Sequence, residues 1–406
     1  MSKVELLAPA GNRECLETAF HFGADAAYVA GKGFGLRAFA ANFDEQELAS
    51  AVAYAHGLGK KIYLTVNSLV FNEELNDLEK YLAFLDTLNI GGIIFSDPAV
   101  LYLSKKLGLK TPLHLSTQAS TVNYCSAAYW YEEGVKRIVL SREMTLKDIK
   151  LLRENTPPEL EIEAFVHGSM CVAHSGRCLL SGALTGRSGN RGECAQPCRW
   201  RFHLSEQGYP GEFFPIDEDE KGTYILNSRD LMVIEHIPEM IGAGISSFKI
   251  EGRMKSAYYV ASVVSAYRRA IDSYYSRGAD YCFDPALKEE LVKSAARGFC
   301  TGFFFGNPLD EGQDIARDEE LRKYTFVAKA LSKSEDGFVW LEQRNKFSLG
   351  EMLEVLSPGS VGMRFKVTEI LNEDGEAQEA APHAQQKIKI ACPCDLQPGD
   401  ILRRHD

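Results

Sequence analysis

The chain has 406 residues, of which 45% are apolar and 25% charged, and its formal net charge is −11 at neutral pH. This length allows two or three domains with a sizeable core. The negative charge argues against a protein that coats nucleic acid indiscriminately, but it leaves room for a local basic surface. The N-terminus lacks a signal-peptide pattern, and no apolar run approaches the roughly 18 residues of a membrane-spanning helix, so we expect a soluble, cytoplasmic protein.

Up to about residue 280, short runs rich in Val, Ile and Leu alternate with helical patterns of about 10–15 residues. Nearly continuous apolar strands that alternate with helices indicate a parallel sheet covered on its outer face. Eight such units are the number at which the sheet closes, so we predict an α/β fold with a (βα)8, TIM-like barrel. In chain order the runs are VELLAPAG, AAYVAG, KIYLTVN, GIIFSD, LHLSTQ, RIVLSR, EIEAFVHG and SSFKIEGR.

Helix boundaries are marked by residues that cap helices. Asn12 and Asp44 each precede a helical pattern that ends at a glycine, and Thr145 with Asp148 three residues later resembles a capping box. After the eighth run, apolar residues recur at helical spacing over 256–275, which predicts a helix with a buried face.

The alternation of strands and helices is interrupted once, after the seventh run. About 75 residues separate that run from the eighth, where an ordinary unit needs far fewer. We therefore predict a barrel domain over 1–305 that carries an insertion over 168–245. The insertion begins at the carboxyl end of a strand, which is the end at which barrels of this type build their active sites.

Beyond residue 305 the pattern changes to short alternating strands separated by EDG, SPG and QPGD turns. At least five such strands indicate a small all-β domain with antiparallel pairing, either a barrel or a sandwich. We place this domain over 306–406.

Four of the ten cysteines lie within one stretch, spaced Cys171-x6-Cys178-x15-Cys194-x3-Cys198. In a reducing compartment, clustered cysteines favour metal binding or catalysis over disulfides. Four thiolates can surround a tetrahedral zinc ion or an iron–sulfur cluster. The gaps are long and no CxxC pair is present, which favours the cluster over zinc, with four thiols that only pack as a third alternative.

The other six cysteines are scattered along the chain. We interpret each as a small buried apolar residue rather than a metal ligand. They are Cys15, Cys125, Cys282, Cys300, Cys392 and Cys394.

Several segments together resemble the signature of the collagenase-like peptidases, peptidase family U32. These segments are EAFVHGSMC, SGRCLLS, the CxxxCRW that follows, LNSRDL and FKIEGRMKS. The resemblance extends from LLAPAGN near the N-terminus into the C-terminal β domain. It implies a barrel followed by a small β domain.

For members with this domain arrangement, the resemblance implies oxygen-independent hydroxylation of the wobble uridine of tRNA to 5-hydroxyuridine, with prephenate as co-substrate. Related members hydroxylate ribosomal RNA or quinone precursors, so another substrate remains an alternative. Several members carry a [4Fe–4S] cluster, for which the implied ligands here are Cys171, Cys178, Cys194 and Cys198. Some relatives take the fourth ligand from further downstream, but LNSRDLMVIEH contains no cysteine, which leaves Cys198.

Prephenate carries two carboxylates, and arginine is the side chain best suited to pair with a carboxylate through two hydrogen bonds. Arg37, Arg142 and Arg253 stand at predicted strand ends and are candidates for this role. Amide side chains in similar places are candidates for hydrogen bonds to the uracil edge or the prephenate hydroxyl, namely Asn67, Gln118 and Asn123.

Charged residues alternate along the last predicted barrel strand. Lys249, Glu251 and Arg253 can point to one side, either into the barrel mouth as functional groups or into an ion pair that closes the barrel. On the seventh strand, the same two-residue alternation places Glu163 and His167 on one side. We predict Glu163, His167, Lys249 and Glu251 as catalytic candidates, with the first two as proton donors or acceptors.

The cysteine-rich stretch is also locally basic. Arginine can contact phosphates and aromatic rings can stack on unpaired bases, so this stretch is a candidate RNA-binding surface. Its candidate residues are Arg177, Arg187, Arg191, Arg199, Trp200 and Arg201.

Peptide hydrolysis is the main alternative from a different class of enzyme. The chain has neither HExxH nor GxSxG, which excludes the commonest zinc and serine arrangements. Cys171 has His167 and His174 nearby in the sequence, so a cysteine nucleophile activated by histidine remains open. That interpretation leaves the other three clustered cysteines unexplained.

Overall fold

A computed structural model describes the chain over residues 3–35, 42–170, 180–187, 193–200, 218–219, 222–223, 228–295, 297–308, 312 and 324–406. The chain forms two compact units. Unit 1 consists of Met1–Leu16, Asp25–Met254 and Arg297–Asp318, and unit 2 consists of Glu17–Ala24, Lys255–Ala296 and Glu319–Asp406.

Unit 1 contains a closed barrel of eight parallel strands among its described residues. The barrel closes because the last strand pairs in parallel with both the first and the seventh. Every one of the eight predicted runs forms one of these strands, so the TIM-like barrel is confirmed. The strands are β1 (Glu5–Pro9), β2 (Ala26–Val29), β3 (Lys61–Val66), β4 (Gly92–Phe95), β5 (Leu113–Leu115), β6 (Arg137–Val139), β7 (Glu161–Ser169) and β11 (Ser247–Ile250).

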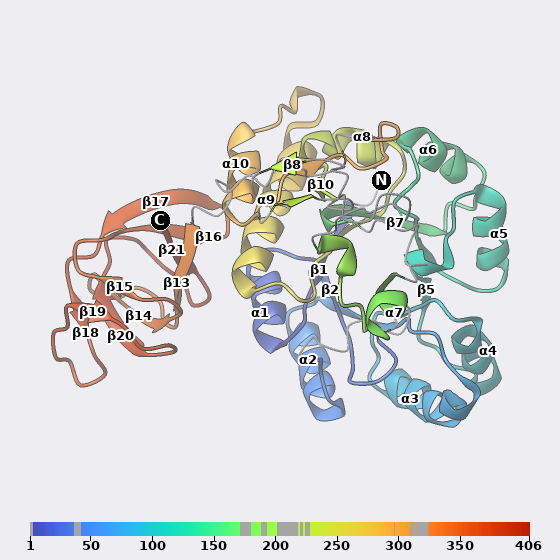
Figure 1. The fold of residues 1–406 in the computed structure, drawn as a ribbon, viewed down its shortest axis with the longest axis horizontal. Helices are drawn as coiled ribbons and strands as arrows, with labels where there is room; N and C mark the ends of the chain where they lie inside the picture. Colours follow the sequence, from blue (N-terminus) through green and yellow to red (C-terminus); the bar gives the residue numbers. More distant parts are fainter. Residues whose placement is uncertain are drawn as a thin grey trace, which may run out of the picture. The chain divides into compact units, whose positions relative to one another are not determined.

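Helices follow one another around the outside of the strands (Figure 1). They are α2 (Glu45–Gly57), α3 (Leu75–Thr87), α4 (Pro98–Leu107), α5 (Tyr124–Glu132) and α6 (Leu146–Glu154). The predicted caps are confirmed. Asp44 and Thr145 form capping boxes, and Asn12 accepts a hydrogen bond from the backbone of Cys15 in α1 (Arg13–His21). Among the helices that the structure describes, not one combines the length and apolarity that a bilayer crossing requires.

The predicted insertion contains helices and strands of its own. Because β7 continues to Ser169, its carboxyl end pairs antiparallel with a further strand, β10 (Asp230–Met232). This strand pairs with β12 (Phe299–Cys300), and the chain then forms η6 (Ile234–His236) and α8 (Ile237–Gly242), which packs against α6. The earlier part holds α7 (Leu180–Thr185), β8 (Glu218–Asp219), β9 (Gly222–Thr223) and η5 (Pro197–Arg199).

Unit 2 contains α9 (Ala257–Arg277), η7 (Gly278–Asp280), α10 (Pro285–Lys293) and the C-terminal strands. Ser256 caps α9, and its predicted apolar face is buried. The predicted all-β domain is confirmed, as an antiparallel sheet in the order β17-β16-β21-β13-β14-β20-β18 with a separate β15–β19 pair. The strands are β13 (Tyr324–Ala330), β14 (Phe338–Gln343), β15 (Phe347–Ser348), β16 (Met352–Ser357), β17 (Ser360–Lys366), β18 (Ile370–Leu371), β19 (Ala380–Ala381), β20 (Lys387–Ala391) and β21 (Ile401–His405).

The six scattered cysteines do not all lie in cores. Cys15, Cys392 and Cys394 are buried as predicted, and Cys300 is half-buried. The prediction is wrong for two others, since Cys125 and Cys282 are exposed. Cys125 lies on the first turn of α5 and Cys282 follows η7, and neither position faces a core.

Candidate functional site

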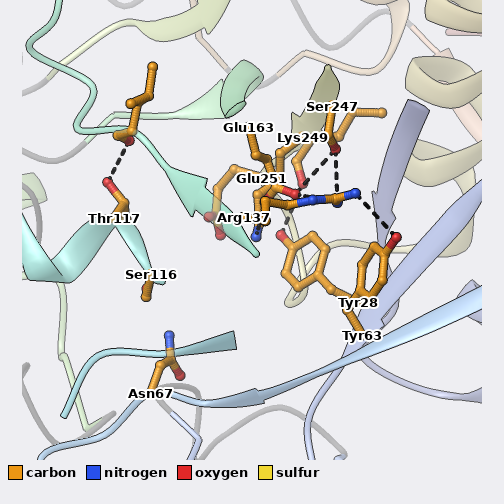
Figure 2. A network of polar contacts seen from close by, with 12 residues as sticks. Tyr28, Tyr63, Asn67, Ser116, Thr117, Arg137, Glu163, Ser247, Lys249 and Glu251 are labelled. Carbon is orange, nitrogen blue, oxygen red and sulfur yellow. Dashed lines mark hydrogen bonds and ion pairs between the residues drawn. The ribbon is translucent and has the colours of Figure 1, made fainter. Parts of the chain in front are cut away.

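A buried ionic network occupies the interior of the barrel (Figure 2). At its centre Glu163 of β7 is fully buried. One carboxylate oxygen accepts from Lys249 Nζ at 2.7 Å, and the other accepts from Arg137 Nη1 at 2.9 Å and from Ser247 Oγ at 3.2 Å. Side chains that project into the barrel interior therefore join strands β6, β7 and β11.

Arg137, the first residue of β6, extends this network toward the amino ends of the strands. Its Nη1 lies 2.6 Å from Glu5 Oε1, and its Nε donates to Glu161 at 2.7 Å. Tyr63 donates to the other oxygen of Glu5 at 2.7 Å. Burial alone would lower the pKa of Arg137, but the carboxylates of Glu163 and Glu5 outweigh it and raise that pKa. The guanidinium is therefore a permanent cation.

Lys249 lies in an aromatic environment. Its ammonium is 4.6 Å from the ring centre of Tyr28 and 5.5 Å from that of Phe165, distances at which a cation is attracted to the ring face. The side chain is buried against Glu163. Of the two interpretations left open by the sequence, this geometry favours the ion pair within the barrel for Lys249.

His114 on β5 is a further buried group in this interior. Its ring lies 4.8 Å from that of Tyr63, and Gly92 makes room for it, since a Cβ at that glycine would come within 2.8 Å of the imidazole. Burial and the charge of Arg137 hold the pKa of His114 well below its ordinary value. The imidazole is therefore neutral and belongs to the packed interior.

The carboxyl ends of β6, β7 and β11 are joined by a second ion pair. Arg142 follows β6, and its Nη1 donates to the backbone oxygen of Ser169 at 2.6 Å while Nη2 lies 3.2 Å from Glu251. Its guanidinium stacks 4.0 Å from the ring centre of Phe165. The backbone nitrogen of Glu251 donates to the oxygen of His167 at 2.8 Å. Arg142 thus holds the segment from which the cysteine-rich stretch begins.

His167 follows Glu163 on β7. The register between β7 and β11 shifts between Lys249 and Ile250, so that His167 pairs with Ile250. This bulge interrupts the two-residue alternation from which Glu163 and His167 were predicted to lie on one side of the strand. His167 is buried, with its ring 5.4 Å from that of Phe299. The predicted proton-transfer roles of both residues stay predictions.

The predicted amide residues lie at the carboxyl ends of β3 and β5. Asn67 Nδ2 donates to Gln118 Oε1 at 3.0 Å, which brings these two candidates together. Asn123 instead caps α5 through the backbone nitrogen of Ser126. Arg253 follows β11, is buried, and lies 3.4 Å from Asn42 Oδ1.

Two of the four clustered cysteines are described by the structure, and both are half-buried thiols. Cys194 Sγ accepts from the backbone nitrogen of Gln196 at 3.3 Å, and Gln196 adopts a positive φ of 56°. Cys198 lies in η5, which packs against α7. Ala195 N donates to Ser181 Oγ of α7 at 3.0 Å, so this short segment is held against that helix.

Among the basic-stretch candidates, Arg187 donates through Nε to the backbone oxygen of Glu193 at 3.1 Å, and Trp200 is exposed. Within the described residues, no three His, Cys, Asp or Glu side chains converge as metal ligands. Several predicted site residues lie outside the described residues, namely Arg37, Cys171, Arg177, Cys178, Arg191 and Arg201, as does the side chain of Arg199.

Sequence reasoning missed most of the inner network. Glu5, Tyr63, His114, Arg137 and Ser247 were not candidates, although each lies on a predicted strand. The available signal was a charged or polar residue within an otherwise apolar run, as at Arg137 in RIVLSR. A residue of this kind inside a barrel requires a partner of opposite charge, and strand alternation alone does not identify that partner.

Comparison with known proteins shows similarity over nearly the whole chain. Residues 11–314 match the family described as peptidase family U32, and residues 322–403 match the peptidase family U32 C-terminal domain. The tRNA hydroxylation protein P1 of Bacillus subtilis is 40% identical over 403 residues, which cover 99% of this chain and 95% of that protein.

Two further relatives carry different names. The tRNA hydroxylation protein P of Escherichia coli is 34% identical and covers 98% of this chain and 95% of its own length. A collagenase of Porphyromonas gingivalis is 30% identical, and the match covers 99% of this chain and 98% of the collagenase. These matches extend through the barrel and the C-terminal domain, and the chain therefore belongs to peptidase family U32.

Proposed function

We propose that this chain is a tRNA-modifying hydroxylase. The observation that carries this proposal is the 40% identity, over 99% of the chain, to a relative named as a tRNA hydroxylation protein. In finer detail, we propose that the substrate is the wobble uridine, that the product is 5-hydroxyuridine, and that prephenate rather than molecular oxygen takes part in the reaction. A wobble uridine lies in a single-stranded loop, so its base can be splayed out of the stack at modest cost.

We further propose that Cys171, Cys178, Cys194 and Cys198 hold a [4Fe–4S] cluster. Two features of the described residues suit thiolate ligands. Cys194 and Cys198 are partly accessible rather than packed in a core, and the amide of Gln196 points at a sulfur, as hydrogen bonds to ligating sulfurs do in such sites. When bound, the cluster would supply a redox-active or Lewis-acidic iron centre.

The chain's own residues would bind and orient the substrates at the carboxyl end of the barrel. Arg37 and Arg253 are proposed to pair with the carboxylates of prephenate, while Arg142 holds Ser169 and Glu251 in place. The Asn67–Gln118 pair is proposed to present an amide edge to uracil. The arginines of the basic stretch are proposed to contact the RNA backbone.

Nucleoside analysis of tRNA tests the function directly. In a strain that lacks this protein and any second family member, we expect wobble 5-hydroxyuridine to disappear and to return when the gene is restored. Blocking prephenate synthesis in the wild type should have the same effect, and supplying prephenate should reverse it. Unchanged 5-hydroxyuridine after deletion would remove the tRNA assignment, and loss after deletion without any response to prephenate would remove the co-substrate alone.

The relative named as a collagenase supports peptide hydrolysis as a second candidate. The purified protein should then cleave denatured collagen, and this cleavage should persist when tRNA and prephenate are absent. Absence of cleavage by a preparation that hydroxylates tRNA would exclude this candidate.

A further inference from the structure

The outer face of two neighbouring strands in unit 2 combines aromatic rings with lysines. Strands β14 and β20 pair antiparallel, with Trp340 directly opposite Lys389. Buried and accessible residues alternate along both strands, which places one set in the core and the other on the outside. We define the Trp340 face as the accessible residues Phe338, Trp340, Lys387 and Lys389.

An open groove of about 360 Å³ lies on this face. This volume is within the range of small-ligand sites. Its lining combines one broad aromatic surface, one cation and one anion with the aliphatic side chain of a half-exposed leucine. The lining residues are Leu331, Ser332, Trp340, Glu373 and Lys387.

The charges of the Trp340 face favour an anionic ligand. Within the described residues, neither Lys387 nor Lys389 forms an ion pair, and the ammonium of Lys389 lies 5.1 Å from the ring centre of Phe338. The nearest cross-strand acid, Glu342, is already paired with Arg344 at 2.6 Å. Two lysines therefore border the partly accessible indole, with Glu373 also lining the groove, although the chain as a whole carries a net charge of −11.

We propose that the Trp340 face binds a single-stranded segment of RNA, with one base stacked on Trp340 and the adjacent phosphates near Lys387 and Lys389. Aromatic rings interleaved with cations are the arrangement that binds unpaired nucleotides, because every base has a face that can stack. Glu373, which also lines the groove, can accept a hydrogen bond from a base N–H group. The inference rests on the proposed function because it takes RNA as the substrate. It adds a second RNA contact, on the C-terminal sheet rather than in the barrel.

Binding of RNA to the full-length chain tests this site. Two probes suit this test, an unmodified tRNA transcript and a fluorescent oligouridine of 12 nucleotides. The anisotropy of each would be measured at several salt concentrations. We expect Trp340→Ala to weaken both complexes about tenfold, since stacking of one base contributes on that order. Trp340→Phe should retain most of the affinity, because the ring face remains.

The lysines should act through charge. Replacing both Lys387 and Lys389 with alanine should lower the slope of log affinity against log salt by about one unit per lysine. Matched controls lie in unit 1, where Tyr102→Ala removes an exposed ring from α4 and Lys147→Ala with Lys150→Ala removes two exposed charges from α6. We expect these controls to bind as the wild type does.

The outcomes separate this site from the proposed function. If Trp340→Ala binds both RNAs as tightly as the wild type, the site is wrong, even where the wild type hydroxylates tRNA. If Trp340→Ala weakens oligouridine binding but the wild type leaves tRNA unmodified, the site stands and the proposed function falls. A wild type that binds neither RNA overturns both.

Discussion

Glu163 combines complete burial with a full set of hydrogen bonds from two cations and a hydroxyl. Burial by itself would raise the pKa of this carboxyl, but Lys249 and Arg137 outweigh it and lower the pKa to about 2. The residue is therefore an anion at neutral pH. Such a group orients its neighbours, and removing it would leave two cations in the barrel without their shared partner.

This network predicts a specific sensitivity to acid. Because the folded pKa of Glu163 is about 2 and the ordinary value is 4.5, its stabilisation is fully present above pH 4.5 and is lost as pH falls toward 2. We expect the wild type to lose on the order of 3 kcal/mol over this interval through Glu163, a loss that Glu163→Gln should not show. Urea unfolding at a series of pH values measures it.

The control for this experiment is Glu161→Gln, which changes a half-exposed partner of the same arginine. It should keep the acid dependence of the wild type. Identical pH dependence in Glu163→Gln and the wild type would contradict the assigned ion pairs.

At the scale of elements, the carboxyl end of β7 determines where the cysteine-rich stretch begins. This strand extends past its pairing with β11, and its last residues are held by β10 on one side and by Arg142 on the other. Further along, η5 is packed on α7 and carries Cys198. The chain is therefore held at Ser169, before Cys171, and at η5, which carries Cys198.

This arrangement predicts the result of removing the clustered thiols. Anaerobically purified wild type should be brown and show a broad absorption band at about 400 nm, as is usual for iron–sulfur proteins. Cys194→Ala and Cys198→Ala should each lose most of this band and of the bound iron. Cys125→Ala and Cys282→Ala, which remove exposed thiols elsewhere, should keep both. A colourless wild type with one equivalent of zinc would contradict the cluster.

At the scale of the whole molecule, unit 2 joins two helices to the C-terminal sheet. Arg403 of β21 is fully buried. Its Nη2 lies 2.6 Å from Glu290 of α10, and its Nε lies 3.0 Å from Glu354 of β16. Lys293 of α10 also contacts Glu354 at 2.7 Å. Burial would raise the pKa of Glu354, but Lys293 and Arg403 lower it to about 2.

We predict that Arg403→Met destabilises α10 and the sheet together. Removing one member of a buried ionic group costs about 3–5 kcal/mol, because the remaining charges lose their partner. Hydrogen exchange should accelerate in α10, β16 and β21 at once. Arg404→Met removes a partly exposed pair with Glu351 from the neighbouring position and should cost at most about 1 kcal/mol. Unchanged exchange in α10 of the Arg403 variant would show that this helix is stable without the sheet.

The sequence by itself determined the eight barrel strands, the helix caps, the insertion after β7 and the all-β C-terminal domain. It did so because these features depend on residues close together in the chain. An apolar run, a two-residue or 3.6-residue period and a cap are all read within a few positions. The family signature was equally visible, since its segments are contiguous.

Only the tertiary structure decided which polar residues meet. Ser247 and Glu5, 242 positions apart, share a hydrogen bond because barrel closure places β11 beside β1. One bulge between β7 and β11 shifts the strand register between Glu163 and His167, which the two-residue period of the sequence does not reveal. Arg403 reaches Glu290 across 113 positions, which no local pattern encodes. Strand register and chain closure set these contacts, and both are properties of the folded chain rather than of any segment of its sequence.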